Sequence, residues 1–308
     1  MLPYKSTANK VDKGIIMSLT KIQFDILDAI IENSDVALYD AVNSSADAVN
    51  QGVKELEELG FVKDGTVTDK GFDAMEPYKV KRAVFIAAGF GSRMVPITLN
   101  TPKPLVRVNG TRIIDTLLDA VIAADIEEII IVRGYLAEQF DQLLYKYPMI
   151  KFIENPLYNE ANNISSALKV KDILSNAYVF EADLYLSNPK IIKKYHYTTN
   201  FLGIKMDRSD DWCFTVNDNV ISGLKVGGRF CYQEVGISYW DAEDGKKLSR
   251  HIEQVFEKPG GKESYWEQVP LVHFVDEYAV QVRECKQEDI IEIDSFKELK
   301  AIDKTYDV

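Results

Sequence analysis

Hydrophobic residues along the chain follow two different periods, and the change from one to the other divides the chain. Residues 18–78 show mainly helical spacing, with apolar side chains three or four positions apart. From residue 79 onward, short runs rich in valine and isoleucine alternate with helical segments. We therefore expect a tail over residues 1–17, a small domain over 18–78 and a larger α/β domain over 79–308.

The small domain is expected to contain three helices, a β-hairpin and one further helical turn. Ser18 or Thr20 can cap the first helix, and Ser44 or Ser45 can cap the third, with a short helix over 36–41 between them. The sequence FVKDGTVT predicts a hairpin that turns at its Asp-Gly pair. This order of elements resembles a winged helix-turn-helix module.

The charge of the small domain argues against the usual role of such a module. Four lysines stand against thirteen acidic residues between Ser18 and Tyr78, and Glu55, Glu57 and Glu58 lie on the helix that would enter the major groove. Because DNA phosphates are held by lysine and arginine, we do not expect sequence-specific DNA binding. We expect a docking or regulatory module. A ligand-responsive DNA-binding regulator is the alternative from another functional class.

The larger domain is expected to be a Rossmann-like, mostly parallel mixed sheet. Its apolar runs VFIAA, EEIIIV, MIKFI and AYVFEA are separated by helical segments, among them residues 114–124 and 136–147. From residue 200 the pattern changes to four short β-like pieces, followed by helical stretches over 246–256 and 265–269. We expect this later part to cover a substrate beside the nucleotide-binding half.

The stretch AAGFGSRMVPITLNTPKPLV, residues 87–106, follows the first strand of this domain. Gly89 and Gly91 allow a tight turn whose N–H groups can cradle phosphate oxygens. Arg93 can place two donors on one phosphate, and the prolines on both sides of Lys103 restrict its backbone. The third glycine of a dinucleotide fingerprint is replaced by Met94, and a Walker Gly-Lys-Ser/Thr is absent. The stretch therefore predicts a loop that grips a nucleoside triphosphate.

This stretch resembles the signature of nucleotidylyltransferases, A-A-G-x-G-S/T-R followed by P-K-x-L. The resemblance implies an enzyme that joins a nucleoside triphosphate to a phosphorylated small molecule and releases pyrophosphate. It implies catalytic roles for Arg93 and Lys103. The implied nucleotide-binding residues are Ala87, Ala88, Gly89, Gly91, Ser92 and Arg93, with Tyr135, Asn163 and Ser166 as further candidates for the nucleoside pocket.

Two pairs of alternating carboxylates follow strand-like runs, Glu181 with Asp183 and Glu292 with Asp294. Each pair places both side chains on one face of an extended chain, and ligands of open α/β sheets bind beyond the carboxyl ends of strands. Carboxylates commonly hold Mg²⁺ in phosphoryl-transfer enzymes. The family resemblance implies that Asp183 and Asp294 are the metal ligands.

Aromatic residues of the later part stand beside acids in the sequence, as in Asp211-Trp212, Trp240-Asp241 and Trp266-Glu267. This combination suits a quaternary ammonium group. The segments GYLAEQF, NPLYNEANNISSAL, EADLYL, GISYWDA, SYWEQV and EIDS resemble bacterial CTP:phosphocholine cytidylyltransferases. The resemblance implies CTP, phosphocholine and Mg²⁺. The candidate substrate-binding residues are Trp212, Tyr239, Trp240 and Trp266.

A sugar phosphate or another amino-alcohol phosphate is the alternative substrate that the sequence leaves open. The net charge of −12 disfavours a general nucleic-acid binder, and the three cysteines lack the spacing of a metal site. The first residues lack the apolar run of a signal peptide, and no stretch approaches the length of a membrane span. We expect a cytoplasmic protein without a membrane partner. Whether it forms a homodimer stays open.

Overall fold

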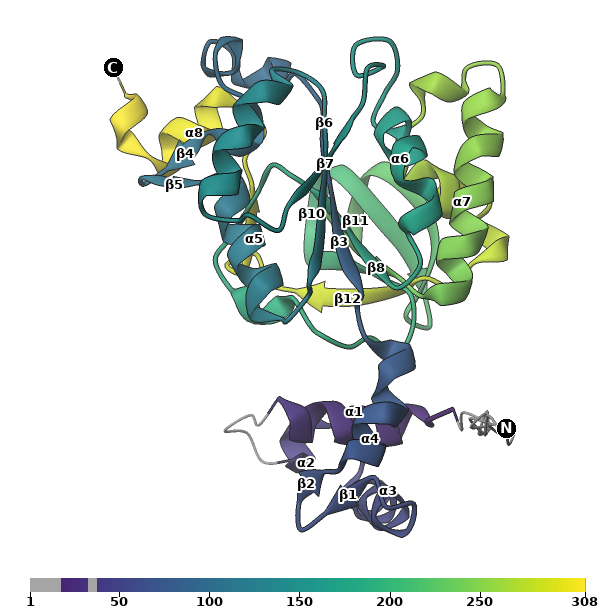
Figure 1. Ribbon diagram of the computed structural model, residues 1–308. Helices are drawn as coiled ribbons and strands as arrows, with labels where there is room; N and C mark the ends of the chain where they lie inside the picture. Colours follow the sequence, from purple (N-terminus) through teal and green to yellow (C-terminus); the bar gives the residue numbers. More distant parts are fainter. Residues whose placement is uncertain (1–17, 33–37, 308) are drawn as a thin grey trace, which may run out of the picture. The chain divides into compact units, whose positions relative to one another are not determined.

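The computed structural model describes residues 18–32 and 38–307. The chain divides between Pro77 and Tyr78 into two compact units, which Figure 1 shows coloured along the sequence. Each unit is described by itself below. Within the described ranges, no helix combines the length and the apolar character needed to cross a bilayer.

Over residues 18–32 and 38–77, the first unit forms four α-helices and a two-stranded hairpin. Thr20 caps the first helix and forms a reciprocal capping box with Gln23, and Ser45 caps the third helix. Asp64 and Gly65 turn the hairpin with φ values of 51° and 72°, the left-handed conformation that an Asp-Gly turn favours. The elements are α1 (Lys21–Ile31), α2 (Leu38–Ala41), α3 (Ala46–Glu58), β1 (Val62–Lys63), β2 (Thr66–Val67) and α4 (Asp69–Met75).

The element order of this unit follows the sequence prediction. Part of the helix predicted over 36–41 lies outside the described residues, and α2 begins at Leu38. The winged-helix assignment itself stays a prediction.

The second unit is built on a seven-stranded mixed sheet, as the sequence predicts. Strands β3, β6, β7 and β8 run parallel to one another, and β10 is parallel to β12. Strand β11 is antiparallel to its neighbours. The spatial order is β10 (Asn200–Asn217), β12 (Gln281–Cys285), β11 (Val220–Trp240), β8 (Ala177–Glu181), β3 (Arg82–Ala87), β6 (Glu128–Arg133) and β7 (Lys151–Glu154).

Alternate residues of the central strands enter two separate cores. Phe85 and Phe180 stack at 4.7 Å in the core on one face, where α5 (Ile113–Ala123) packs. Val84 and Val179 point to the core on the other face, beneath α6 (Ile164–Val170) and α7 (Ala242–Glu257). Figure 1 shows α5 on one side of the sheet and α6 and α7 on the other. The middle residues of these strands are apolar because both faces of the sheet are covered.

Three predicted elements differ in the structure. The helix predicted over 136–147 is a 3₁₀-helix, η5 (Ala137–Tyr145), and the helix predicted over 265–269 is replaced by a turn followed by the π-helical segment η9 (Val269–His273). The four short β pieces are two long strands, β10 and β11, joined at Asp218 and Asn219. The sequence pattern predicts breaks where the strands are in fact irregular. Gly227 and Phe230 have positive φ values, and the pairing of β10 with β11 shifts in register at several positions. The two strands continue through these irregularities.

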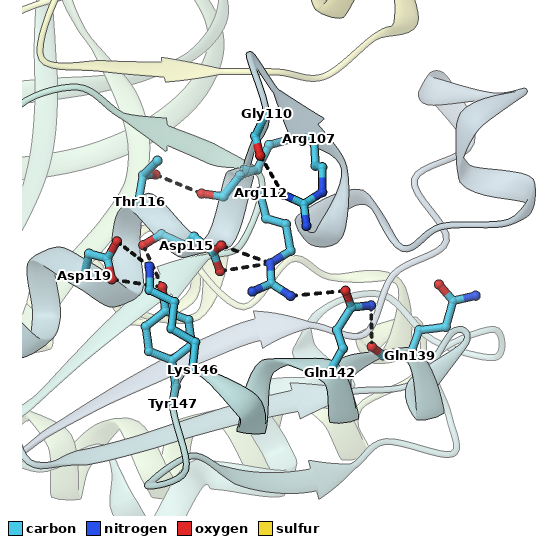
Figure 2. A network of polar contacts seen from close by, with 11 residues as sticks. Arg107, Gly110, Arg112, Asp115, Thr116, Asp119, Gln139, Gln142, Lys146 and Tyr147 are labelled. Carbon is cyan, nitrogen blue, oxygen red and sulfur yellow. Dashed lines mark hydrogen bonds and ion pairs between the residues drawn. The ribbon is translucent and has the colours of Figure 1, made fainter.

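Helix η5 is fixed to α5 by the polar network of Figure 2. Arg112 is 8% exposed, and its Nε lies 3.1 and 3.0 Å from the two carboxylate oxygens of Asp115. The Arg112 guanidinium also donates to Gln142 Oε1 at 3.1 Å. At the far end, Lys146 and Tyr147 both donate to Asp119, each at 2.9 Å. The buried arginine thus links the start of α5 to η5.

A short antiparallel pairing joins distant parts of the chain at the edge of the second unit. Glu292 of β13 (Ile290–Glu292) lies opposite Leu184 of β9 (Leu184–Leu186). The remaining elements of this region are β4 (Arg107–Val108), β5 (Thr111–Arg112) and α8 (Phe296–Ile302). Ser295 caps the start of α8 with a capping box. This pairing brings the two acidic segments of the sequence together.

Candidate active site

The loop after β3 has the tight turn that its glycines predict. Gly91 has a φ of +68°, and a Cβ there would lie 3.1 Å from the Lys103 Cβ and 3.2 Å from the Thr98 Cγ2. A side chain at this position would therefore be strained and crowded. A Cβ on Gly89 would meet nothing within 4 Å, so the backbone on that side is open to a ligand.

Lys103 is a buried cation held between two carboxylates. Only 7% of the residue is exposed, and its Nζ lies 2.7 Å from Asp183 Oδ2 and 2.7 Å from Asp294 Oδ1. Burial alone would lower the pKa of Lys103, but the charges of Asp183 and Asp294 outweigh it and raise the pKa above the ordinary value. Lys103 is therefore a permanent positive charge at this point.

Arg93 reaches the same centre from the other end of the loop. Its guanidinium lies 2.7 Å from Asp294 Oδ1, while its own side chain is 69% exposed. Because the Arg93 side chain is exposed to water, its pairing with Asp294 is weakened, and it can leave this carboxylate for a phosphate at small cost. The structure thus gathers the predicted catalytic residues Arg93 and Lys103 around the predicted metal ligands.

The acidic centre contains one set of three carboxylates suited to a metal ion. Oxygens of Glu181, Asp183 and Glu292 lie within 4.8 Å of one another. Burial, followed by repulsion from Asp183 and Asp294, raises the pKa of Glu292 to about 11. Burial, followed by repulsion from Glu267 and Asp183, raises the pKa of Glu181 well above its usual range. A nearby divalent cation would relieve this repulsion.

These carboxylates fit Mg²⁺ in their chemistry. They are hard oxygen donors, and Asp183 Oδ1 is buried without a hydrogen-bond partner among the residues described. The sequence assigned Asp183 and Asp294 to the metal. Asp294 is not a member of this set, and its Oδ1 contacts Lys103 and Arg93. The structure therefore adds Glu181 and Glu292 as candidate ligands beside Asp183.

A cavity of about 670 Å³ opens over this centre. The glycine loop, the acidic strand ends and the β10–β11 hairpin all contribute to its wall. The lining residues include Ala87, Gly89, Gly91, Ser92, Arg93, Lys103, Asn162, Asn163, Glu181, Asp183, Asp211, Trp212, Leu224, Glu234, Tyr265, Glu267, Gln268, Glu292 and Asp294.

One part of the cavity wall combines aromatic rings with acids. Trp212 and Tyr265 meet edge to face, with ring centroids 5.8 Å apart. Glu234 and Glu267 line the cavity with them. Burial raises the pKa of Glu267 to about 7, and repulsion from Glu234 adds to this effect. Ring faces and carboxylates are the groups that hold an organic cation in proteins.

Three predicted substrate-binding aromatics lie elsewhere. Tyr239, Trp240 and Trp266 are 0%, 0% and 1% exposed and do not line the cavity. Trp240 and Trp266 pack against each other at 6.0 Å, and Tyr239 stacks on His196 at 4.5 Å. Their apolar bodies complete the two cores, so we withdraw them from the substrate pocket and retain Trp212.

Only some of the predicted nucleoside-binding residues lie at the cavity. Ala87 and Asn163 line the cavity, whereas Ala88, Tyr135 and Ser166 do not. Ser166 is 2% exposed and accepts from Asn155 Nδ2 at 2.9 Å. The Tyr135 hydroxyl is turned to the backbone of the glycine loop. These three residues contact protein groups and not the cavity.

Glu234 is a cavity residue that the sequence reasoning missed. It lies in the middle of β11, where a single acid in a long β pattern gives only a weak signal. Burial, followed by repulsion from Glu181, raises its pKa well above the ordinary value. Tyr265 and Glu267 are neighbours of Trp266 in the sequence. The sequence therefore indicated the correct segment, but Tyr265 and Glu267 line the cavity and Trp266 is buried.

Comparison with known proteins defines the class to which this site belongs. A family model described as nucleotidyl transferase matches residues 82–219, which include the glycine loop and Asp183. The chain is also 37% identical to a curated relative over 228 residues, which are 73% of this chain and 92% of the relative. The chain therefore belongs to the nucleotidyl transferase family and is an enzyme of the nucleotidyltransferase class.

Several of the similar proteins are cytidylyltransferases. The 37% identical protein is the 2-aminoethylphosphonate cytidylyltransferase of Lancefieldella rimae. The choline-phosphate cytidylyltransferase of Streptococcus pneumoniae is 31% identical over 224 residues, which cover 72% of this chain and 97% of that protein. A solved structure of the CTP:phosphocholine cytidylyltransferase from Streptococcus pneumoniae superposes with a TM-score of 0.68 at 30% identity, covering 74% of this chain and 99% of that one.

Proposed function

We propose that this protein transfers a cytidylyl group from CTP to a small amine that carries a phosphate or phosphonate, and releases pyrophosphate. Phosphocholine, the substrate that the sequence predicts, belongs to this class, as does 2-aminoethylphosphonate. The observation that carries the proposal is one cavity with Lys103 between Asp183 and Asp294, and with Trp212 and acids in its wall.

The chemistry needs no general base, because the attacking phosphate or phosphonate oxygen is already an anion. This oxygen forms a bond to the α-phosphorus of CTP as the bond from that phosphorus to the bridging oxygen breaks, and pyrophosphate leaves with the electron pair. The open backbone at Gly89 and the exposed guanidinium of Arg93 bind the triphosphate. Buried Lys103 stabilises negative charge on the reacting phosphates, since a preorganised cation is most effective out of water.

Mg²⁺ would be held by Asp183 together with Glu181 and Glu292, with Asp294 as the further ligand that the sequence predicts. When bound, it neutralises phosphate charge and orients the triphosphate. The protein's own contribution at this place is the crowded set of carboxyl groups. Burial and repulsion within the set raise the pKa values of Glu181 and Glu292, and these values would fall when a cation binds.

The amine end of the substrate is proposed to lie against Trp212, Tyr265, Glu234 and Glu267. Ring faces favour a trimethylammonium group, and carboxylates favour the N–H donors of a primary ammonium group. A neutral sugar would leave these carboxylates without a positive partner. Substrates with a cationic amine are therefore preferred over sugar phosphates.

Pyrophosphate release tests the proposal directly. CTP, UTP, ATP and GTP are each combined with phosphocholine, phosphoethanolamine, 2-aminoethylphosphonate and glucose 1-phosphate in the presence of Mg²⁺. We expect turnover with CTP and at least one of the three amines, and negligible turnover with glucose 1-phosphate. Faster turnover with the sugar phosphate than with every amine would refute the proposal.

A further inference from the structure

The segment 96–100 of the glycine loop has no direct part in the proposed chemistry, yet it is held by an unusual number of hydrogen bonds from outside. The Tyr135 hydroxyl lies 2.9 Å from the Thr98 carbonyl oxygen and 3.2 Å from that of Leu99. Gln139 donates to the Asn100 carbonyl oxygen at 2.8 Å. Three successive backbone carbonyls are thus fixed by two side chains from the segment that follows β6.

Thr98 connects this fixed segment to the phosphate-binding turn. Its residue is fully buried, and its hydroxyl donates to the Gly91 carbonyl oxygen at 2.9 Å. Its methyl group lies on the side of Gly91 that a Cβ would occupy, beside the Lys103 side chain. Thr98 therefore contacts the turn through both a hydrogen bond and packing, and any displacement of Thr98 moves Gly91.

Tyr135 holds the loop at both ends. Its backbone N–H donates to the Ala88 carbonyl oxygen at 3.0 Å, where the loop begins, and its hydroxyl contacts the Thr98 carbonyl ten residues later. Its ring meets Phe90 edge to face at 4.7 Å. The backbone N–H and the hydroxyl of Tyr135 both contact the loop backbone, and the residue does not line the cavity.

We propose that Thr98 and Tyr135 are positioning residues that set the shape of the phosphate-binding turn for a nucleoside triphosphate. The inference rests on the proposed function, because it assigns the turn to the triphosphate. It replaces the sequence-based assignment of Tyr135 to the nucleoside pocket. Thr98 and Tyr135 act through the backbone of Gly89 and Gly91 and touch neither substrate.

The test compares Thr98→Val and Tyr135→Phe, which remove one hydroxyl each, with the wild-type chain. The dissociation constant for CTP is measured by calorimetry with Mg²⁺ and without a second substrate, followed by KM for both substrates. Loss of the hydrogen bonds through which these hydroxyls order the turn should raise the dissociation constant and the KM for CTP by about tenfold. The KM for the amine substrate should stay unchanged, and Thr98→Ser should restore CTP binding.

Matched controls remove the same kind of hydroxyl group from the polar network between α5 and η5 that Figure 2 shows. Tyr147→Phe deletes a hydroxyl that donates to Asp119 at 2.9 Å, and Thr116→Val deletes one that donates to the Ile113 carbonyl at 2.8 Å. Both controls should lower the melting temperature without weakening CTP binding. If they weaken CTP binding as much as Thr98→Val and Tyr135→Phe do, the positioning role is wrong.

Other outcomes separate the two proposals. CTP binding at wild-type strength in both test variants overturns the positioning role, and so does loss of CTP-over-UTP preference in Tyr135→Phe alone, which would indicate direct base contact. If Thr98→Val does not fold, Tyr135→Phe decides, because its ring remains in place. A wild-type chain that binds CTP without transferring it refutes only the proposed function, whereas one that binds no nucleoside triphosphate refutes both.

Discussion

Lys103 Nζ lies 2.7 Å from Asp294 Oδ1, although 191 residues separate the two in sequence. The pairing of β9 with β13 makes this contact, because it places the C-terminal acidic segment beside Asp183. Lys103 then neutralises part of a cluster that would otherwise be a buried group of like charges. The same ammonium group is available to the phosphates of a substrate.

Lys103→Ala is expected to lower kcat by about 100-fold or more, because a preorganised charge at the reacting phosphates is lost. Pyrophosphate release under saturating substrates measures the effect. Lys151→Ala serves as the control, since its ammonium is 68% exposed and pairs with Glu128 away from the cavity. Turnover near the wild-type value in Lys103→Ala would remove this residue from the mechanism.

Asp183→Asn is expected to shift the Mg²⁺ titration of activity to higher concentration. Loss of even an outer partner of a metal ligand costs about 10–100-fold in metal affinity, so loss of a ligand should cost at least as much. Asp119→Asn, which alters an exposed carboxylate beside Lys146, is the control and should titrate like the wild type. An unchanged titration in Asp183→Asn would contradict the metal assignment.

Trp212→Ala is expected to raise the KM for the amine substrate by about thirtyfold, which corresponds to the ~2 kcal/mol of a desolvated cation–π contact. The KM for CTP should change little. Trp240→Phe is the comparison, because Trp240 is fully buried and its replacement should lower the melting temperature and leave both KM values in place. Equal losses for both substrates in Trp212→Ala would indicate a packing role instead.

A chain that begins at Tyr78 is expected to fold and to retain transferase activity. Tyr78 belongs to the second unit, where its carbonyl accepts from the His196 N–H at 2.9 Å and its ring stacks on Tyr197 at 5.5 Å. A chain that begins at Lys81 lacks both contacts and should melt at a lower temperature. Circular dichroism and pyrophosphate release measure the two properties. A folded but inactive chain from Tyr78 would show that the first unit is required for catalysis.

His196 is expected to make the second unit less stable as pH falls below about 6.5, the ordinary pKa of histidine. Burial, followed by the charges of Arg283 and Lys193, lowers the pKa of His196 well below that value. Between the two pKa values the unfolded chain binds a proton that the folded chain does not. The contribution of neutral His196 to the free energy of unfolding is therefore complete above about pH 6.5 and is lost as the pH falls. Urea unfolding at several pH values should therefore show a smaller loss in His196→Gln than in the wild type. Parallel curves for the two proteins would contradict this assignment.

The sequence allowed the sheet and the glycine loop to be predicted because both depend on local patterns. The apolar runs around Phe85 and Phe180 are typical of strands that are buried on both faces of a sheet, so they can be recognised without knowing the order of the strands. The side of the cavity that would hold the amine was harder to predict. Trp212 and Trp266 each stand beside an acid in the sequence, but Trp212 lines the cavity and Trp266 is buried in a core. Burial is decided by packing between distant segments, and a single sequence does not record it.

The antiparallel pair of β9 and β13 also has a consequence for the order in which the site can assemble during folding. Asp183 and Glu292 come from segments that are distant in sequence, so neither segment alone forms the acidic centre. A chain that has formed the central strands still lacks half of this centre until β13 pairs with β9. Metal binding is therefore expected to report on a late step of folding, after the central sheet has formed.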